Sequence, residues 1–82
     1  MKTSGAKPTR QMVREVVHMM MKDETLGIRA HGSIYTVSPL GSSRFLAVRE
    51  KTPQGLKVGT MFLGEFIDLI YGFRDSAKVV RI

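Results

Sequence analysis

Aromatic and cationic side chains alternate with apolar ones over residues 44–51, whose sequence is Arg-Phe-Leu-Ala-Val-Arg-Glu-Lys. Successive side chains of a β-strand point to opposite faces, so a strand here would carry Phe45, Arg49 and Lys51 on one side. Such a face suits single-stranded nucleic acid, because a base can stack on the ring while the cations neutralise phosphates. Both sides are partly apolar, however, so the pattern also allows Phe45 in the core and Arg49 as a solvated strand charge.

A turn and a second strand follow this segment. Residues 52–55 read Thr-Pro-Gln-Gly, in which proline presets φ and glycine supplies the left-handed position of a bulged hairpin. Alternation in the second strand separates Leu56, Val58, Thr60 and Phe62 on one face from Lys57, Gly59, Met61 and Leu63 on the other.

A basic stripe runs along the segment 10–22, which has helical periodicity. Arg10, Arg14, His18 and Lys22 follow one another at intervals of four and therefore share one side of a helix. Its Arg10, Arg14 and Lys22 are candidate phosphate contacts, because a helix with cations on one side can follow a nucleic-acid backbone. The alternative is a solvent-facing side that happens to be basic, with Glu15 pairing with nearby cations.

The same helix is rich in methionine. Its apolar arc is broad enough to suggest cover on two sides, by the sheet and by a second subunit. Methionine fills irregular cores and also adaptable binding surfaces. Met12, Met19 and Met20 are therefore either core residues or part of a dimer or partner surface.

The sequence offers little for catalysis or metal binding. His18 and His31 are the two histidines, the chain has no cysteine, and no nucleophile or HExxH motif is present. The glycines of the segment 27–32 lack the Lys-Ser/Thr of a phosphate loop, so they are interpreted as turn residues. We therefore expect a non-catalytic protein without a cofactor or metal.

Composition points to a small protein with an anionic partner. The chain has 82 residues, 43% of them hydrophobic, and a net charge of +6, so we expect one domain over residues 1–82. The charge favours nucleic acid first, an acidic protein second and an anionic membrane third. No signal-peptide core or membrane-length apolar stretch is visible, which predicts a cytoplasmic protein, including the nucleoid, or a nuclear one in a eukaryote.

The predicted fold is α+β. After a flexible basic arm over residues 1–7, Thr9 caps a helix over 10–22, and Gly27 permits a reversal. An antiparallel sheet of three to five strands contains the central hairpin, a second helix packs on it, and a strand ends the chain. The expected strands are 28–31, 34–38, 44–51, 56–63 and 77–82, with a loop over 39–43 and the second helix over 64–71.

Several segments between residues 34 and 70 resemble the single-stranded-DNA-binding transcriptional positive-cofactor family. They are Ile-Tyr-Thr-Val at 34–37, Phe-Leu-Ala-Val-Arg-Glu at 45–50, Pro-Gln-Gly-Leu-Lys-Val-Gly at 53–59, and Phe62-Leu63 leading into a helix with Glu65 and Phe66. The resemblance implies a curved antiparallel sheet backed by a helix, dimers formed through the helices, and single strands lying across the sheets. It also implies DNA contacts from Arg44, Arg49, Lys51 and Lys57.

The chain departs from that family in several places. The family's Lys-Gly cluster is reduced to Lys57 and Gly59, the hairpin loop is shorter, and Phe66 stands in place of tryptophan. The N-terminal helix and the final strand lie outside the family pattern.

These observations favour a small, dimeric, basic protein that binds nucleic acid, DNA rather than RNA, as a transcription or replication regulator. The alternative is a protein-protein interaction module, a small inhibitor or adaptor that uses the methionine-rich helix and the basic surface.

Overall fold

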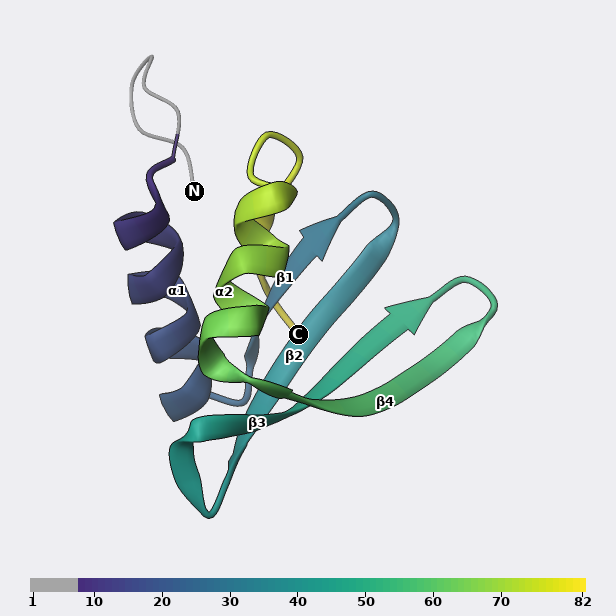
Figure 1. The fold of residues 1–82 in the computed structure, drawn as a ribbon. Coiled ribbons are helices and arrows are strands. Elements are labelled where there is room, and N and C mark those ends of the chain that lie inside the picture. Colours follow the sequence, from purple (N-terminus) through teal and green to yellow (C-terminus); the bar gives the residue numbers. More distant parts are fainter. Residues whose placement is uncertain (1–7) are drawn as a thin grey trace.

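The computed structural model describes residues 8–82, so the basic arm expected over residues 1–7 lies outside the described part. A five-stranded antiparallel sheet has the order β4-β3-β2-β1-β5, and two helices pack on one of its faces (Figure 1). The predicted α+β class is confirmed, with the C-terminal strand at one edge of the sheet. In chain order, the elements are α1 (Arg10–Lys22), β1 (Leu26–Ala30), β2 (Ser33–Leu40), β3 (Ser42–Thr52), β4 (Gly55–Phe62), α2 (Leu63–Gly72) and β5 (Lys78–Arg81).

The core lies between the helices and one face of the sheet. Helix α1 packs on β1 and β2, α2 packs on β3 and β4, and the two helices contact each other. Burial of apolar side chains is the main favourable term in forming these layers. The largest fully buried side chains are Val13, Val17 and Met20 of α1, Ile28 of β1, Leu46 of β3, and Phe66, Ile67 and Ile70 of α2.

Thr9 is the N-cap of α1, as predicted. Its hydroxyl accepts a hydrogen bond from the Met12 backbone N–H at 3.2 Å, which satisfies one of the free donors at the helix start. After the helix ends, the Asp23 carboxylate accepts bonds from the Thr25 backbone N–H at 2.9 Å and the Thr25 hydroxyl at 2.6 Å. These bonds, with the charge of Arg81, lower the pKa of the Asp23 carboxyl.

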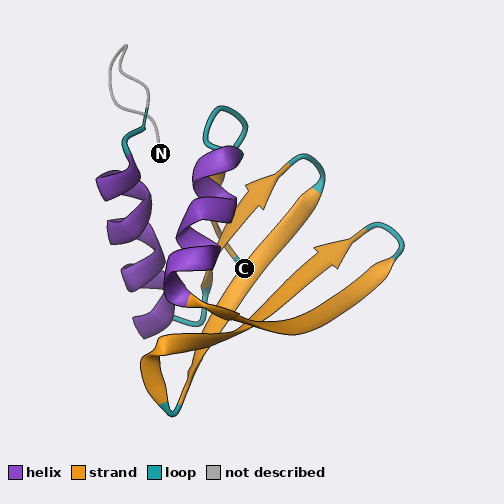
Figure 2. Ribbon diagram, viewed as in Figure 1, coloured by secondary structure: helices purple, strands orange, loops and turns teal. Residues whose placement is uncertain are grey.

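The connection between β2 and β3 is shorter than predicted. Strand β2 runs on to Leu40 and β3 begins at Ser42, so the expected loop over residues 39–43 is wrong (Figure 2). The reversal is made at Gly41, whose φ of 71° is accessible to glycine. The pairing of β2 with β3 shifts register between Pro39 and Leu40. This shift allows the two strands to be joined by a tight turn instead of a longer loop.

Two further turn predictions need correction. Gly27 lies inside β1, and the reversal between α1 and β1 is made before it, where the Leu26 N–H donates to the Asp23 carbonyl oxygen at 3.2 Å. The next reversal, between β1 and β2, is at His31 and Gly32, which have φ values of 36° and 84°. In the β3–β4 hairpin, the turn is where it was expected, and Gly55 has a φ of 144°. The pairing nevertheless runs without a shift from Thr52 opposite Gly55 to Phe45 opposite Phe62, so the predicted bulge is absent.

Neither helix of the described chain is long and apolar enough to cross a membrane. The β3–β4 hairpin extends away from both helices, so its turn end projects beyond the helical layer (Figure 1).

Candidate nucleic-acid interface

The face of the sheet opposite the helices, which we call the open face, carries the aromatic and cationic residues of the hairpin. Leu46 and Val48 of β3 are buried under the helices. Strand alternation therefore places Phe45, Arg49 and Lys51 on the open face, where Phe45 is half-buried and both cations are exposed. Of the two orientations that the sequence left open, the structure has the one with the cations and the aromatic ring on the uncovered side.

Strand pairing places three cations in one row across the open face. Lys51 of β3 lies opposite Ile34 of β2, which lies opposite Arg29 of β1, and Arg29 lies opposite Lys78 of β5. Neighbouring strands are about 4.8 Å apart, so the row extends over roughly 14 Å from Lys51 to Lys78. Arg49 lies in the next row, opposite Thr36. A chain of phosphates could contact several of these cations at once.

An aromatic pair lies at the other end of the open face. Phe45 of β3 and Phe62 of β4 are cross-strand partners, with ring centroids 5.2 Å apart and planes inclined at 54°. The Phe62 side chain is 60% exposed. Phe45 and Lys51 are six positions apart in β3, which is roughly 20 Å along a strand. An exposed ring of this kind offers a stacking surface for a planar base.

The open face is concave around Arg49 and Thr36. Two hollows of about 270 and 390 Å³ share these residues and Ile82. Leu56 of β4 and Ile82, which follows β5, both line the smaller hollow. Residues from the two edges of the sheet therefore border one hollow, which makes this face a trough.

The charge of the trough is of one sign. The charged side chains that the strands place on the open face are Arg29, Arg49, Lys51 and Lys78, and Glu24 at the rim is the acidic residue that borders a hollow. Two ion pairs occur among residues 8–82, Arg10–Asp68 and Arg81–Asp23, and neither uses an open-face cation. These cations are consequently available to an anionic ligand.

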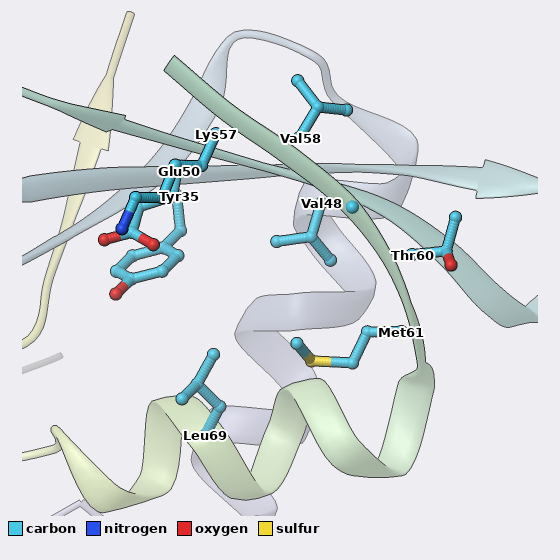
Figure 3. Close-up of a pocket in the computed structure, with 9 residues that line it drawn as sticks. Tyr35, Val48, Glu50, Lys57, Val58, Thr60, Met61 and Leu69 are labelled. Carbon is cyan, nitrogen blue, oxygen red and sulfur yellow. The ribbon is translucent and has the colours of Figure 1, made fainter. Parts of the chain in front are cut away.

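The other predicted contact residues lie elsewhere. Alternation along the hairpin places Arg44 and Lys57 on the opposite face from Phe45, so the four cations implied by the family resemblance do not form one surface. Lys57 lies opposite Glu50 and lines a cleft of about 210 Å³ between β4 and α2 (Figure 3). This separation could have been predicted from the sequence, because the alternation that places Arg49 and Lys51 on one face places Arg44 and Lys57 on the other.

The basic stripe of α1 belongs to the helical layer. Arg14 and Lys22 are exposed there, on the side of the sheet away from the trough. Arg10 is engaged within the chain, because its guanidinium donates to Asp68 of α2 at 2.6 and 3.0 Å. A ligand in the trough would therefore not contact this stripe.

The three candidate methionines differ in position. Met20 is 1% exposed and belongs to the core, so its assignment to a dimer or partner surface is wrong. Met12 is half-buried, and its sulfur accepts a hydrogen bond from the Thr9 backbone N–H at 3.4 Å. Met19 is exposed at 56% and remains available to a partner. The second cover of α1 is α2 of the same chain.

Sequence reasoning missed Arg29, Lys78 and Phe62 as open-face site residues. Phe62 could have been found. Alternation places it on the same face of its strand as Leu56, and the short turn over residues 52–55 pairs Leu56 with Lys51 on the open face. Arg29 and Lys78 join Lys51 only through the pairing of β1 with β2 and β5, which periodicity within a strand does not reveal.

On the covered side, Glu50 and Tyr35 line the cleft of Lys57 (Figure 3). The Glu50 carboxylate accepts a hydrogen bond from the Ser33 hydroxyl at 3.0 Å. Burial, followed by the charge of Glu50 and a hydrogen bond with it, raises the pKa of the Tyr35 hydroxyl. Among residues 8–82, no group of three or more His, Cys, Asp or Glu side chains is placed to hold a metal ion.

Comparison with protein-family models, curated proteins and solved structures gives no match to this chain.

Proposed function

We propose that this protein binds single-stranded nucleic acid along the open face of its sheet, without catalysis. The observation that carries the proposal is that one trough combines an aromatic pair, half-buried Phe45 and exposed Phe62, with four cations and no acidic strand residue. Cationic grooves that follow a backbone, together with rings on which bases stack, are how proteins bind single strands.

The cation row and Arg49 would contact phosphates, while Phe45 and Phe62 would contact bases. Roughly 20 Å between these two ends corresponds to about six stacked nucleotides at 3.4 Å each, and to fewer if the strand is extended. In a duplex, the bases are already stacked on one another and cannot reach the rings. The arrangement therefore favours a single strand.

DNA in preference to RNA, and a role in transcription or replication regulation, complete the proposal. The resemblance of residues 34–70 to the positive-cofactor family supports both, and the net charge of +6 supports a polyanionic ligand of either kind.

The test is fluorescence anisotropy of a labelled oligothymidylate titrated with the protein at two salt concentrations, with oligouridylate and a duplex of equal length as competitors. We expect binding that weakens as salt rises, because neutralised phosphates release counterions. We also expect oligothymidylate to bind more tightly than the other two. Absence of binding at low salt would overturn the proposal and direct the search to an acidic protein partner.

Paired variants locate the site. Arg49→Ala with Lys51→Ala removes two open-face cations, and Arg14→Ala with Lys57→Ala removes two cations from the opposite side. Since each lost phosphate contact changes the slope of log K against log salt by about 0.7, the first pair should reduce the slope by about 1.4. The second pair should leave it nearly unchanged. Equal losses in both pairs would contradict a site in the trough.

A further inference from the structure

Strand β4 is an edge strand with little of the usual protection. It pairs with β3 on one side only, and every residue from Gly55 to Thr60 is exposed. Edge strands are commonly protected by charges, proline or bulges. Within β4, Lys57 is the single charge, there is no proline, and the pairing with β3 has no register shift. The free edge can therefore accept another strand.

Of the four β4 side chains that face the trough, all but Thr60 are apolar. Leu56, Val58 and Phe62 are 60%, 64% and 60% exposed and share the open face. Apolar side chains along an unpaired strand are typical of a surface that a further strand covers.

We propose that β4 pairs antiparallel with β4 of a second copy of this chain. Residues paired across antiparallel strands point to the same face. A register with the two-fold axis at Gly59 thus continues the open face from one copy into the other. It places Leu56 opposite Phe62 of the second copy, and Val58 opposite Thr60 of the second copy.

Charge and size fit this register. Lys57 meets Met61 of the second copy, so the one cation of the strand is not opposed to itself, and no like charges face each other. An axis one residue earlier, at Val58, gives an equal overlap but leaves Phe62 without a neighbour. With the axis at Gly59, by contrast, Leu56 and Phe62 are cross-strand partners, and by symmetry this apolar contact occurs twice.

Gly59 supplies an independent argument. Glycine inside a strand weakens it and often marks a place where another backbone approaches closely. A Cβ at Gly59 would meet nothing within 4 Å in the single chain, and its φ is not positive. The single chain therefore gives no packing reason for glycine here, and the missing side chain leaves the covered face beside the axis open to side chains of the second copy.

Pairing would join two five-stranded sheets into one and place two troughs side by side. It does not depend on nucleic-acid binding, so the experiment is carried out on the protein alone. By light scattering after size exclusion, we expect twice the chain mass of 9.2 kDa. Leu56→Lys should raise the dimer dissociation constant at least tenfold, because it removes an apolar contact with Phe62 of the second copy and adds a second lysine to the edge strand, where lysine opposes further strand pairing. Met19→Lys, the same change on the exposed surface of α1, should not.

Single cysteines test the register, since the chain has none of its own. Gly59→Cys should form a disulfide-linked dimer on mild oxidation, because the two Cα atoms at the axis lie within the ~4.4–6.8 Å that a disulfide spans. Lys57→Cys, on the same strand and face, should not, since its two copies would be roughly 14 Å apart. A monomer at all concentrations, a dimer weakened by Met19→Lys instead of Leu56→Lys, or cross-linking at position 57 instead of 59 would overturn the proposal.

Discussion

Tyr35 of β2 and Glu50 of β3 are cross-strand partners on the covered face of the sheet, and the pairing perturbs the ionisation of the tyrosine. Tyr35 is almost fully buried. Loss of solvent disfavours the phenolate most, and the neighbouring carboxylate disfavours it further, so both raise the pKa of Tyr35.

The first prediction concerns the titration of Tyr35. In a Tyr71→Phe variant, Tyr35 is the remaining tyrosine, and its ultraviolet absorbance should report a pKa above the ordinary value of about 10. Because the folded-state pKa is raised, this group's contribution to stability is fully present below the unfolded pKa and is lost as pH rises through the folded pKa. Glu50→Gln should lower the pKa of Tyr35. A Tyr35 pKa at or below 10 would contradict the pairing.

The second prediction concerns stacking on Phe62. Phe62→Ala should weaken binding of a single-stranded oligonucleotide by about 1–3 kcal/mol, because one base loses the phenylalanine ring on which it stacks. The salt slope should stay unchanged, since no phosphate contact is removed. Anisotropy titrations give both quantities, and Leu40→Ala, another exposed apolar residue, is the control. A loss that appears in the salt slope would show that Phe62 does not act by stacking.

The third prediction concerns the ion pair between the helices. Arg10 and Asp68 are 41% and 67% exposed in their side chains, and exposed pairs contribute at most about 1 kcal/mol. Asp68→Ala should therefore lower the free energy of unfolding by less than that amount in urea denaturation. Arg10→Ala should leave oligonucleotide affinity unchanged, because Arg10 lies outside the trough. If Arg10→Ala reduced the affinity for the oligonucleotide, the basic stripe of α1 would have to contact the nucleic acid.

The fourth prediction compares two glycines. A Cβ at Gly27 would lie 3.1 Å from the Tyr35 carbonyl oxygen and 3.3 Å from Ile34 Cγ2. Gly27→Ala should thus lower the free energy of unfolding by about 1–3 kcal/mol through overpacking. Gly64, in the first turn of α2, has open space at its Cβ, so Gly64→Ala should raise stability by up to about 1 kcal/mol. Equal effects in urea denaturation would contradict the close packing at Gly27.

Local patterns predicted most elements of this fold. The helical period over residues 10–22, with Thr9 before it, gave α1 and its cap, and alternation gave the faces of the hairpin. Loop lengths were less accessible, because each glycine could adopt a positive φ and the sequence does not say which ones do. Gly27 extends a strand while Gly32 turns the chain.

The candidate site was only partly predictable, for two physical reasons. The row that joins Lys51 to Arg29 and Lys78 depends on the order of strands distant in sequence. The apolar arc of α1 is too broad for periodicity to orient it, so Met19 and the buried Met20 could not be distinguished.

Phe62 is both the last residue of β4 and the N-cap of α2, and its backbone N–H donates to the Glu65 carboxylate at 3.0 Å. The same residue exposes its ring on the open face. A ligand that holds this ring in place would also restrain the backbone from which α2 starts. Amides in the first turn of α2 would then exchange hydrogen more slowly. Their exchange rate would report whether the trough is occupied, although the ligand does not touch the helical layer.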